Sequence, residues 1–228
     1  LVAASSGCSS ASACQAVTAS AQRTPFTHHD MLRLDRISGL SVDPSGTRAV
    51  FQVRATDMAK NKGVSSLWLK DLSKPATPEV RLAVSDSGAV GAVWGPTGTH
   101  LYFLSARRGG TMQLYRCDAI GASGEQVTHL PLDIQAFRIT PDGSGAVVGL
   151  AVFPDEQGEE VAGTVAALAK QAESKATGHV YDRVFVRHWD SWADGTRNHL
   201  FHVAFGPNGR VTALTPGFDG DIPSKPFG

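Results

Sequence analysis

The sequence lacks an excess of charge of either sign, and it lacks a long apolar run. Lys and Arg together number 21, and Asp and Glu together also number 21, so the formal net charge is zero. Nucleic-acid binders and proteins that adhere to anionic membranes concentrate positive charge, so we expect neither kind of partner. No stretch of 18 apolar residues occurs, and the sequence therefore predicts no transmembrane helix.

Cysteine is also scarce, with only Cys8, Cys14 and Cys117 in 228 residues. Three cysteines cannot build a disulfide framework for a chain of this size. Neither a C-x-x-C pair nor a Cys/His cluster with zinc spacing occurs. Cys117 follows the apolar stretch Leu114-Tyr115 and is predicted to be a buried free thiol.

The histidines do not form a metal-binding pattern either. His28, His29 and Asp30 are adjacent, and neighbouring residues of a helical or extended backbone cannot all converge on one ion. His199 and His202 are three residues apart, which places them on opposite faces of a strand. We therefore predict no metal site and no cofactor.

The N-terminal segment differs in composition from the rest of the chain. Residues 1–22 are almost wholly small, and Ala19-Ser20-Ala21 has the small-x-small pattern of a signal-peptidase site. This segment predicts the remnant of an export signal, and hence a periplasmic or secreted protein; the alternative is a disordered tail. The stretch 11–14 resembles a weak lipobox without its usual Leu, which would place a lipid anchor on Cys14. Residues 23–36 are predicted to be a linker.

What the sequence does contain is a repeated turn. Gly and Pro supply 24 and 12 residues, whereas charged residues supply only 18%, a composition that favours short strands. Pro stands second and Gly fourth in three tetrads that precede apolar stretches, as in tight turns between antiparallel strands. The tetrads are 43–46 (DPSG), 95–98 (GPTG) and 140–143 (TPDG).

Each of these turns lies between two predicted strands, and the first two repeats continue with more. Third strands are predicted at 66–69 and 112–115, and fourth strands at 81–83 and 125–128. The turn prolines are 52 and 45 residues apart. Four antiparallel strands at this interval are typical of a β-propeller blade.

The third repeat is interrupted. Between 154 and 178 the strand pattern stops, and apolar residues at helical spacing predict one helix within 156–175. Strands are predicted to resume at 180–187 and at 200–205, and the turn-like stretch 206–209 is assigned to a later hairpin.

The predicted fold is therefore all-β: a partial β-propeller of about three to four four-stranded antiparallel blades with one helical insertion, over residues 37–228. At the observed spacing the chain holds three blades and the beginning of a fourth. A propeller protects its sheet edges by closing a ring of typically 4 to 8 blades. We therefore expect the chain to be part of a longer protein.

One segment is more specific than the turns. Residues 187–201 read RHWDSWADGTRNHLF, and with the turn repeats this segment resembles the N-terminal propeller of the prolyl oligopeptidase family of serine peptidases, in its bacterial acylaminoacyl-peptidase and dipeptidyl-peptidase 5 branch. The resemblance implies a C-terminal α/β-hydrolase domain with a Ser-Asp-His triad. It also implies that the propeller controls access to the active site and positions short peptides for release of dipeptidyl or acylaminoacyl groups.

That hydrolase domain is expected to be absent from this chain, because no G-x-S-x-G nucleophile motif occurs in the sequence. We assign no catalytic residue here and predict that the chain alone is inactive. The partners that the resemblance implies are a short peptide and the hydrolase domain of the same protein. The alternative function is a non-catalytic periplasmic propeller that resembles TolB, shares the turn repeats and acts as a protein-interaction scaffold.

The candidate substrate-binding residues lie in the same specific segment. They are Arg187, His188, Trp189, Asp190, Trp192 and Asp194. By the resemblance, an Asp pairs with a peptide ammonium while a Trp packs on the peptide side chain. The alternative is structural: Trp and His pack between blades, and Asp190 or Asp194 caps the turn at Gly195.

Overall fold

A computed structural model of the chain describes residues 25–154, 160–178, 180, 181, 184, 186–206 and 209–222. The chain divides into two compact units, Leu1–Arg33 and Leu34–Gly228. In the first unit, helix α1 (His28–Arg33) lies within the predicted linker. It is capped by Thr27, whose backbone N–H donates to Asp30 Oδ2 at 2.8 Å. The predicted signal segment, including Cys8 and Cys14, lies outside the described residues.

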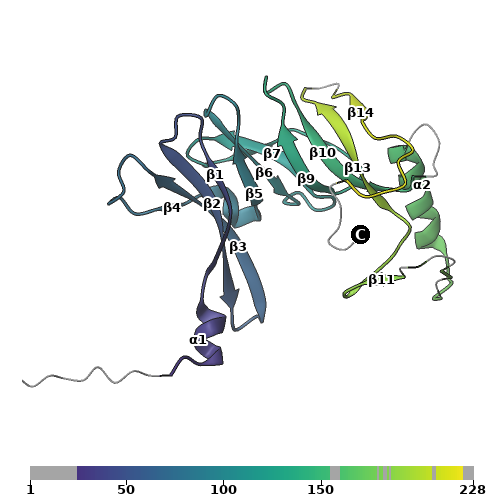
Figure 1. Cartoon of the computed structure of the whole chain (residues 1–228), viewed down its shortest axis with the longest axis horizontal. Helices are drawn as coiled ribbons and strands as arrows, with labels where there is room; N and C mark the ends of the chain where they lie inside the picture. The colour runs from purple at the N-terminus through teal and green to yellow at the C-terminus, as the bar shows by residue number, and fades with distance from the viewer. Residues whose placement is uncertain are drawn as a thin grey trace, which may run out of the picture. The chain divides into compact units, whose positions relative to one another are not determined.

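The second unit contains three four-stranded antiparallel sheets (Figure 1). Sheet 1 consists of β1 (Arg36–Val42), β2 (Arg48–Asp57), β3 (Lys62–Asp71) and β4 (Val80–Arg81). Sheet 2 consists of β5 (Val90–Trp94), β6 (His100–Ser105), β7 (Gln113–Asp118) and β8 (Gly124–Gln126). Sheet 3 consists of β9 (Ile134–Ile139), β10 (Gly145–Val152), β13 (Arg197–Ala204) and β14 (Val211–Ala213). These sheets are the blades of a partial β-propeller, as predicted.

The repeated tetrads form the turn between the first and second strand of every sheet. In each, the backbone N–H of the Gly donates to the carbonyl of the first residue, at 2.9 Å for Gly46, 3.0 Å for Gly98 and 2.9 Å for Gly143. The three glycines have φ between 69° and 73°, a left-handed conformation that other residues adopt only at a cost. The sequence therefore predicted these turns from local backbone geometry alone.

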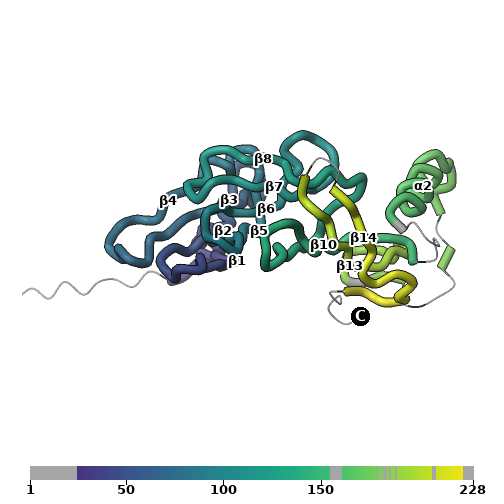
Figure 2. The backbone as a smooth tube through the Cα atoms, turned by 90° about the horizontal axis from the view of Figure 1, so that it is seen from above, coloured from purple at the N-terminus to yellow at the C-terminus, as the bar shows by residue number. Residues whose placement is uncertain are grey.

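Sheet 2 is the centre of the unit, because it is covered on both faces (Figure 2). On one face, Phe103 and Tyr115 pack in a cluster with Val50 of sheet 1. On the other face, Leu114 packs in a second cluster with Phe201 of sheet 3. Since successive strand residues point to opposite faces, a strand with two covered faces is apolar almost throughout, as β6 is.

A polar network also joins sheet 1 to sheet 2 at the turns. The carboxylate of Asp43 accepts hydrogen bonds from the hydroxyl of Ser45 and from the guanidinium of Arg48. Arg48 Nη2 donates to the carbonyl of Gly98 at 2.7 Å, and its Cζ lies 4.4 Å from the ring centroid of Trp94. Arg48 therefore connects the first turn of sheet 1 to the first turn of sheet 2.

The predicted helix is confirmed as α2 (Glu160–Glu173), but the strand predicted at 180–187 is wrong. Among its described residues only Arg187 lies in a strand, β11 (Arg187–His188), which pairs with β12 (Ser191–Trp192) in an isolated two-stranded hairpin. A two-stranded ribbon without a covering layer gains little burial. The described apolar residues Val180, Val184 and Val186 accordingly lie outside any strand.

The start of a fourth blade, which the residue count predicted, is not found among the described residues up to Ile222. The strand predicted at 200–205 completes sheet 3 instead, because β13 pairs with β10 over eight residues. The later hairpin predicted at 206–209 joins β13 to β14 of the same sheet. Residues 214–222 then run back along β13, where the backbone N–H of Ile222 donates to the carbonyl of Asn198 at 2.7 Å.

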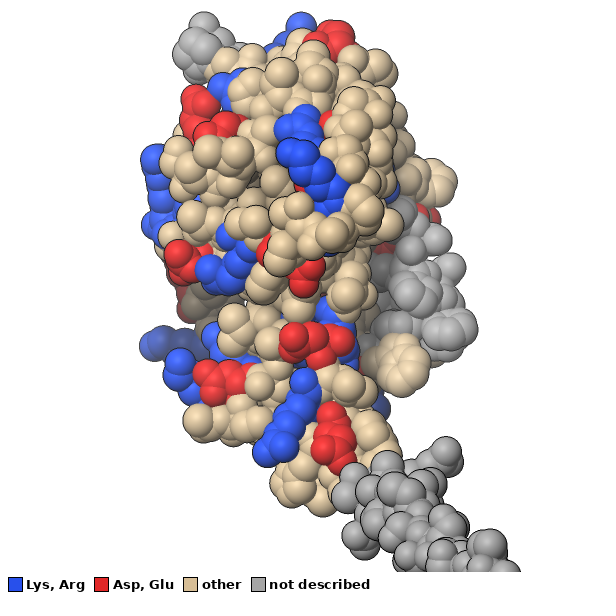
Figure 3. All heavy atoms as spheres, turned by 90° about the vertical axis from the view of Figure 1, so that its left-hand side faces the viewer, with Lys and Arg blue, Asp and Glu red and all other residues tan. Residues whose placement is uncertain are grey.

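The surface of sheet 1 that faces away from sheet 2 carries exposed apolar side chains, including Ile37 (71% exposed) and Leu40 (69%). From this side, Lys and Arg are interspersed with Asp and Glu, and neither sign gathers into a continuous field (Figure 3).

In the part of the chain that the structure describes, no helix has the length and apolar character needed to cross a membrane.

Candidate functional site

The specific segment 187–201 lies in the connection between β10 and β13, the second and third strands of sheet 3. Both ends of this connection are fixed, because β10 and β13 pair continuously from Gly145↔Ala204 to Val152↔Arg197. Helix α2 is seated against the same sheet: the Thr164 hydroxyl accepts a hydrogen bond from the backbone N–H of Phe153 at 2.9 Å. The sheet therefore presents the insertion from a rigid base.

The β11–β12 hairpin is the part of the insertion that carries the candidate residues. Arg187 pairs with Trp192 and His188 with Ser191, which leaves Trp189 and Asp190 as a two-residue turn. Trp189 has φ 50°, a left-handed conformation that Gly adopts easily and a bulky side chain does not. The chain thus holds a large aromatic residue at the tip of the hairpin at a conformational cost.

The aromatic side chains of the hairpin are largely exposed. Trp189 is 75% exposed and Trp192 is 62% exposed. Trp192 is held in place by two neighbours: the ring of Tyr181 stacks on it with a centroid distance of 6.0 Å, and Arg187 Cζ lies 5.4 Å from its ring centroid. In the described part of the chain, both indoles therefore lie outside the packing between the three blades.

The two candidate aspartates differ in their surroundings. Asp194 Oδ1 accepts hydrogen bonds from the backbone N–H of Thr196 at 2.9 Å and from its hydroxyl at 2.7 Å. Asp194 therefore caps the turn at Gly195, as the structural alternative predicted for one of the two aspartates. Asp190 lies exposed at the hairpin tip, where the hydroxyl of Ser191 is 3.4 Å from its carboxylate.

The structure thus brings Arg187, Trp189, Asp190 and Trp192 together on one hairpin, with His188 opposite Ser191 in its register. Asp194 lies just beyond the hairpin and orders the chain that enters β13. The sequence did not single out Tyr181 as a member of this group. Tyr181 precedes the hairpin by several residues and meets Trp192 only through the path of the chain.

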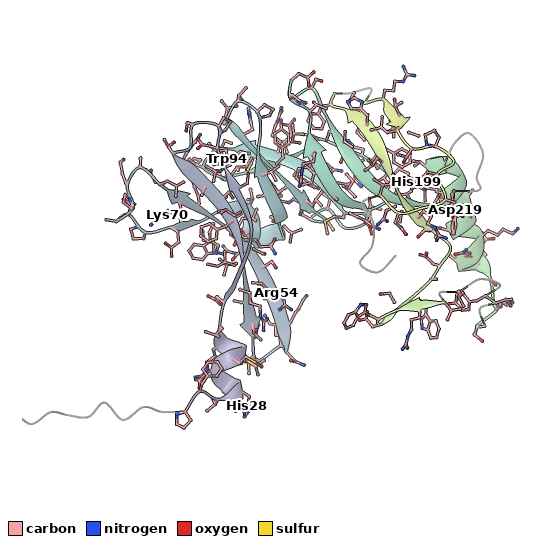
Figure 4. All side chains as sticks on the ribbon, viewed as in Figure 1. His28, Arg54, Lys70, Trp94, His199 and Asp219 are labelled. Atoms are coloured by element: carbon pink, nitrogen blue, oxygen red, sulfur yellow. The ribbon has the colours of Figure 1, made fainter. Side chains whose placement is uncertain are left out.

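His199 has a structural role. It is fully buried, and its Nε2 lies 2.6 Å from the carbonyl oxygen of Phe218, which can only accept, so Nε2 donates. Nearby, Arg197 Nε lies 3.4 Å from Asp219 Oδ1, so His199 and Arg197 both hold the segment that follows β14 (Figure 4). His202 is the register partner of Val147 and follows His199 by three positions in β13. The two histidine side chains therefore point to opposite faces of the strand, as predicted.

Cys117 is a buried free thiol, as predicted. Burial raises the pKa of its thiol to about 12, so the thiolate form needed for nucleophilic chemistry or metal binding is negligible at neutral pH. A hollow of about 250 Å³ borders Cys117, and the ion pair between Arg116 and Glu125 lines its rim at 2.7 Å. Within the described ranges, no three His, Cys, Asp or Glu side chains form a group that would hold a metal ion.

Comparison with known proteins shows what this chain is related to. No family model matches the sequence. The dipeptidyl-peptidase 5 of Porphyromonas endodontalis is 26% identical over 185 residues, which are 79% of this chain and 24% of the relative. The chain is a homologue of the dipeptidyl-peptidases 5. The predicted resemblance to the prolyl oligopeptidase family is thereby confirmed.

Two solved structures share the fold. The acylaminoacyl peptidase of Pyrococcus horikoshii superposes with a TM-score of 0.55 at 10% identity, over 81% of this chain and 26% of that one. The AtxE2 isopeptidase superposes with a TM-score of 0.57 at 21% identity, over 84% and 32%. This chain spans about a quarter of the length of the dipeptidyl-peptidases 5 that it matches.

Proposed function

We propose that this chain is the propeller portion of a serine peptidase that releases dipeptidyl or acylaminoacyl groups from the N-terminus of short peptides. In that protein the blades limit access to the active site, and the β11–β12 hairpin positions the substrate. The observation that carries the proposal is the homology to dipeptidyl-peptidase 5 over 79% of a chain whose described residues form three blades.

The nucleophile of this peptidase belongs to a C-terminal α/β-hydrolase domain of the same protein. A hydrolase serine needs a strained strand-to-helix turn next to the backbone N–H groups that stabilise the oxyanion. The present sequence contains no G-x-S-x-G motif. The contribution of this chain is therefore recognition and not bond cleavage.

The hairpin supplies two complementary groups for a peptide N-terminus. The carboxylate of Asp190 is exposed at the hairpin tip and pairs with the peptide ammonium through charge-assisted hydrogen bonds. Trp192 offers an aromatic surface to the first side chains of the peptide, and its ring is kept in place by Arg187 and Tyr181. Trp189 and His188 belong to the same hairpin, and Asp194 caps the turn that follows it.

Activity-based labelling of the full-length protein tests the proposal. The protein encoded by the complete gene should release dipeptides from chromogenic substrates, and a fluorophosphonate should label one serine outside residues 1–228. The 228-residue chain alone should remain unlabelled. A gene that continues only with further blades, or an unlabelled and inactive full-length protein, would support the TolB-like scaffold and overturn the proposal.

The hairpin residues are tested by kinetics in the full-length enzyme. Asp190→Ala and Trp192→Ala should raise KM for peptides with a free N-terminus about tenfold, because a group that holds the substrate equally in the ground and transition states acts chiefly on KM. For N-acylated peptides, Asp190→Ala should have no effect, since the ammonium is missing. The matched control is Asp142→Ala, at an exposed turn of the same sheet. Unchanged KM with a large loss of thermal stability would return the hairpin to a structural role.

A further inference from the structure

Two arginines face each other directly in sheet 1. Arg36 at the start of β1 is the register partner of Arg54 in β2, and both side chains are exposed. Gln52, two positions before Arg54, faces sheet 2, because its Oε1 accepts a hydrogen bond from the backbone N–H of Gly91. The side chain of Arg54 points to the same face of sheet 1, since side chains two positions apart in a strand share a face. Like charges opposite each other destabilise a sheet, so this pair costs stability unless something neutralises it.

No acidic side chain neutralises the pair within the described part of the chain. Four other arginines, in contrast, each lie within 3.4 Å of a carboxylate oxygen: Arg48, Arg81, Arg116 and Arg197. Asp57, at the end of β2, pairs with Lys60 at 3.4 Å instead. Arg36 and Arg54 therefore leave their guanidinium donors open to a carboxylate from elsewhere.

The Arg54 side chain extends across to Gly63 of β3. Its guanidinium lies where the Cβ of residue 63 would be, and residue 63 is Gly. Any side chain at Gly63 would push the guanidinium away from the strand. The glycine therefore leaves the space that the Arg54 guanidinium occupies, and a guanidinium that is restricted in position loses less conformational entropy on binding.

The pair lies at the end of the sheets from which the insertion projects. Arg54 lies near the connection between β2 and β3, and the insertion is the connection between β10 and β13. Both connect the second to the third strand of their sheet, so both lie at the same end of the blades, opposite the Pro-Gly turns (Figures 1 and 4). The arginine pair and the β11–β12 hairpin thus face the same side of the propeller.

We propose that Arg36 and Arg54 bind a carboxylate of the peptide substrate, either its C-terminal carboxylate or an acidic side chain near the C-terminus. Guanidinium forks match a carboxylate with two parallel hydrogen bonds. The inference rests on the proposed function: Asp190 of sheet 3 receives the ammonium end of the peptide, and the arginine pair of sheet 1 receives the acidic end. Recognition of both ends selects short peptides.

The test compares three substrates of the full-length enzyme: a short peptide with a free C-terminal carboxylate, its C-terminal amide, and an amide with Glu at the penultimate position. Arg36→Gln and Arg54→Gln should each lower the kcat/KM ratio of acid to amide by about tenfold, since one charged hydrogen bond contributes this much. Gly63→Ala should lower the same ratio without removing charge. Arg210→Gln, at an exposed arginine in the β13–β14 connection, should leave the ratio unchanged.

The Glu-containing amide identifies the source of the carboxylate. If the arginine variants affect it as strongly as the free acid, an acidic side chain also occupies the site; if only the free acid is affected, the ligand is the C-terminus. An unchanged acid-to-amide ratio in an active enzyme overturns the inference. The inference is also overturned if the arginine variants have a lower melting temperature but the same acid-to-amide ratio, because the arginines then pair with an acidic side chain of the protein itself. A wild-type protein that hydrolyses no peptide contradicts the proposed function instead.

Discussion

Two places in this chain combine two stacked aromatic rings with an arginine, and they have opposite environments. In sheet 2, Phe103 and Tyr115 stack at 5.8 Å, with Arg107 Cζ 4.8 Å from the ring centroid of Phe103, and both rings are buried. In the insertion, Trp192 combines in the same way with Tyr181 and Arg187 but is 62% exposed. The same residue types are therefore buried inside a blade in one place and exposed on a hairpin in the other.

The hydrogen bonds of the two arginines explain the difference. Arg107 donates to the hydroxyl of Ser105 at 3.0 Å and to the carbonyl of Val84 at 2.8 Å, so its charge is satisfied inside the blade. Burial lowers the pKa of its guanidinium, although an arginine remains charged at neutral pH. Arg187, in contrast, lies over the ring of Trp192 without an ion pair in the described ranges.

The largest expected effect compares the two aromatic groups directly. Phe103→Ala should lower the free energy of unfolding by about 3–5 kcal/mol, because it leaves a cavity between sheets 1 and 2. Trp192→Ala should cost less than about 1 kcal/mol, because an exposed side chain loses little packing. Differential scanning calorimetry of the full-length protein measures both. Equal losses in melting temperature would show that the hairpin aromatics are packing residues after all.

A smaller effect is expected at Asp43, whose side chain is buried in the network between sheets 1 and 2. Burial raises its pKa, but the hydrogen bonds from Ser45, Arg48 and Thr47 outweigh this and lower the pKa from 3.8 to about 2. Because the folded-state pKa lies below the unfolded-state value, the carboxylate stabilises the fold above about pH 4. This contribution decreases as the pH falls from about 4 toward about 2.

Thermal melts at several pH values test this account. Asp43→Asn should lower the melting temperature more at pH 7 than at pH 3, since at the lower pH the unfolded state, with its higher pKa, already binds the proton and part of the wild-type stabilisation is lost. The control is Asp86→Asn, which removes an exposed ion pair with Arg81 and should change the melting temperature little. A difference between Asp43→Asn and wild type that stays constant down to pH 2 would contradict the network.

The smallest expected effect concerns the tip of the hairpin. Trp189→Gly removes a left-handed non-glycine residue and should raise the free energy of unfolding by about 1 kcal/mol or less, because Gly relieves the strain but adds freedom to the unfolded chain. If Trp189 contributes to recognition, the same variant should raise KM. Calorimetry measures the change in the free energy of unfolding, and kinetics on the same preparation measure the change in KM. A destabilised variant would mean that the indole packs on the protein.

The sequence predicted those parts of the fold that depend on local geometry. Pro and Gly set the backbone of the three turns, and the apolar spacing within 156–175 predicted α2. The strand at 180–187 was wrong because its apolar residues suggested a sheet partner that the described fold does not provide. Most of the candidate site was predicted because the specific segment is contiguous and folds into a single hairpin.

The remaining features depend on register between distant residues. Arg36 meets Arg54 only because the β1–β2 pairing shifts between Ser38 and Ser41, where Gly39 has φ 60°; a glycine inside a strand suggests a bulge but does not fix the register that follows. The stacking of Tyr181 on Trp192 likewise depends on how the chain returns toward β12. Neither contact has a sequence signal of its own, so both required coordinates.

The connection between β10 and β13 also bears on how such proteins diverge. Because the entropy of closing a loop grows only with the logarithm of its length, residues 153–196 cost about 2 kcal/mol more than a short turn. The eight continuous residue pairs between β10 and β13 offset that cost without any contribution from the insertion. A lineage can therefore lengthen or shorten the part of this connection outside α2 while the blade persists, whereas α2 itself is constrained by the packing of Val161 and Val165 on the core of sheet 3.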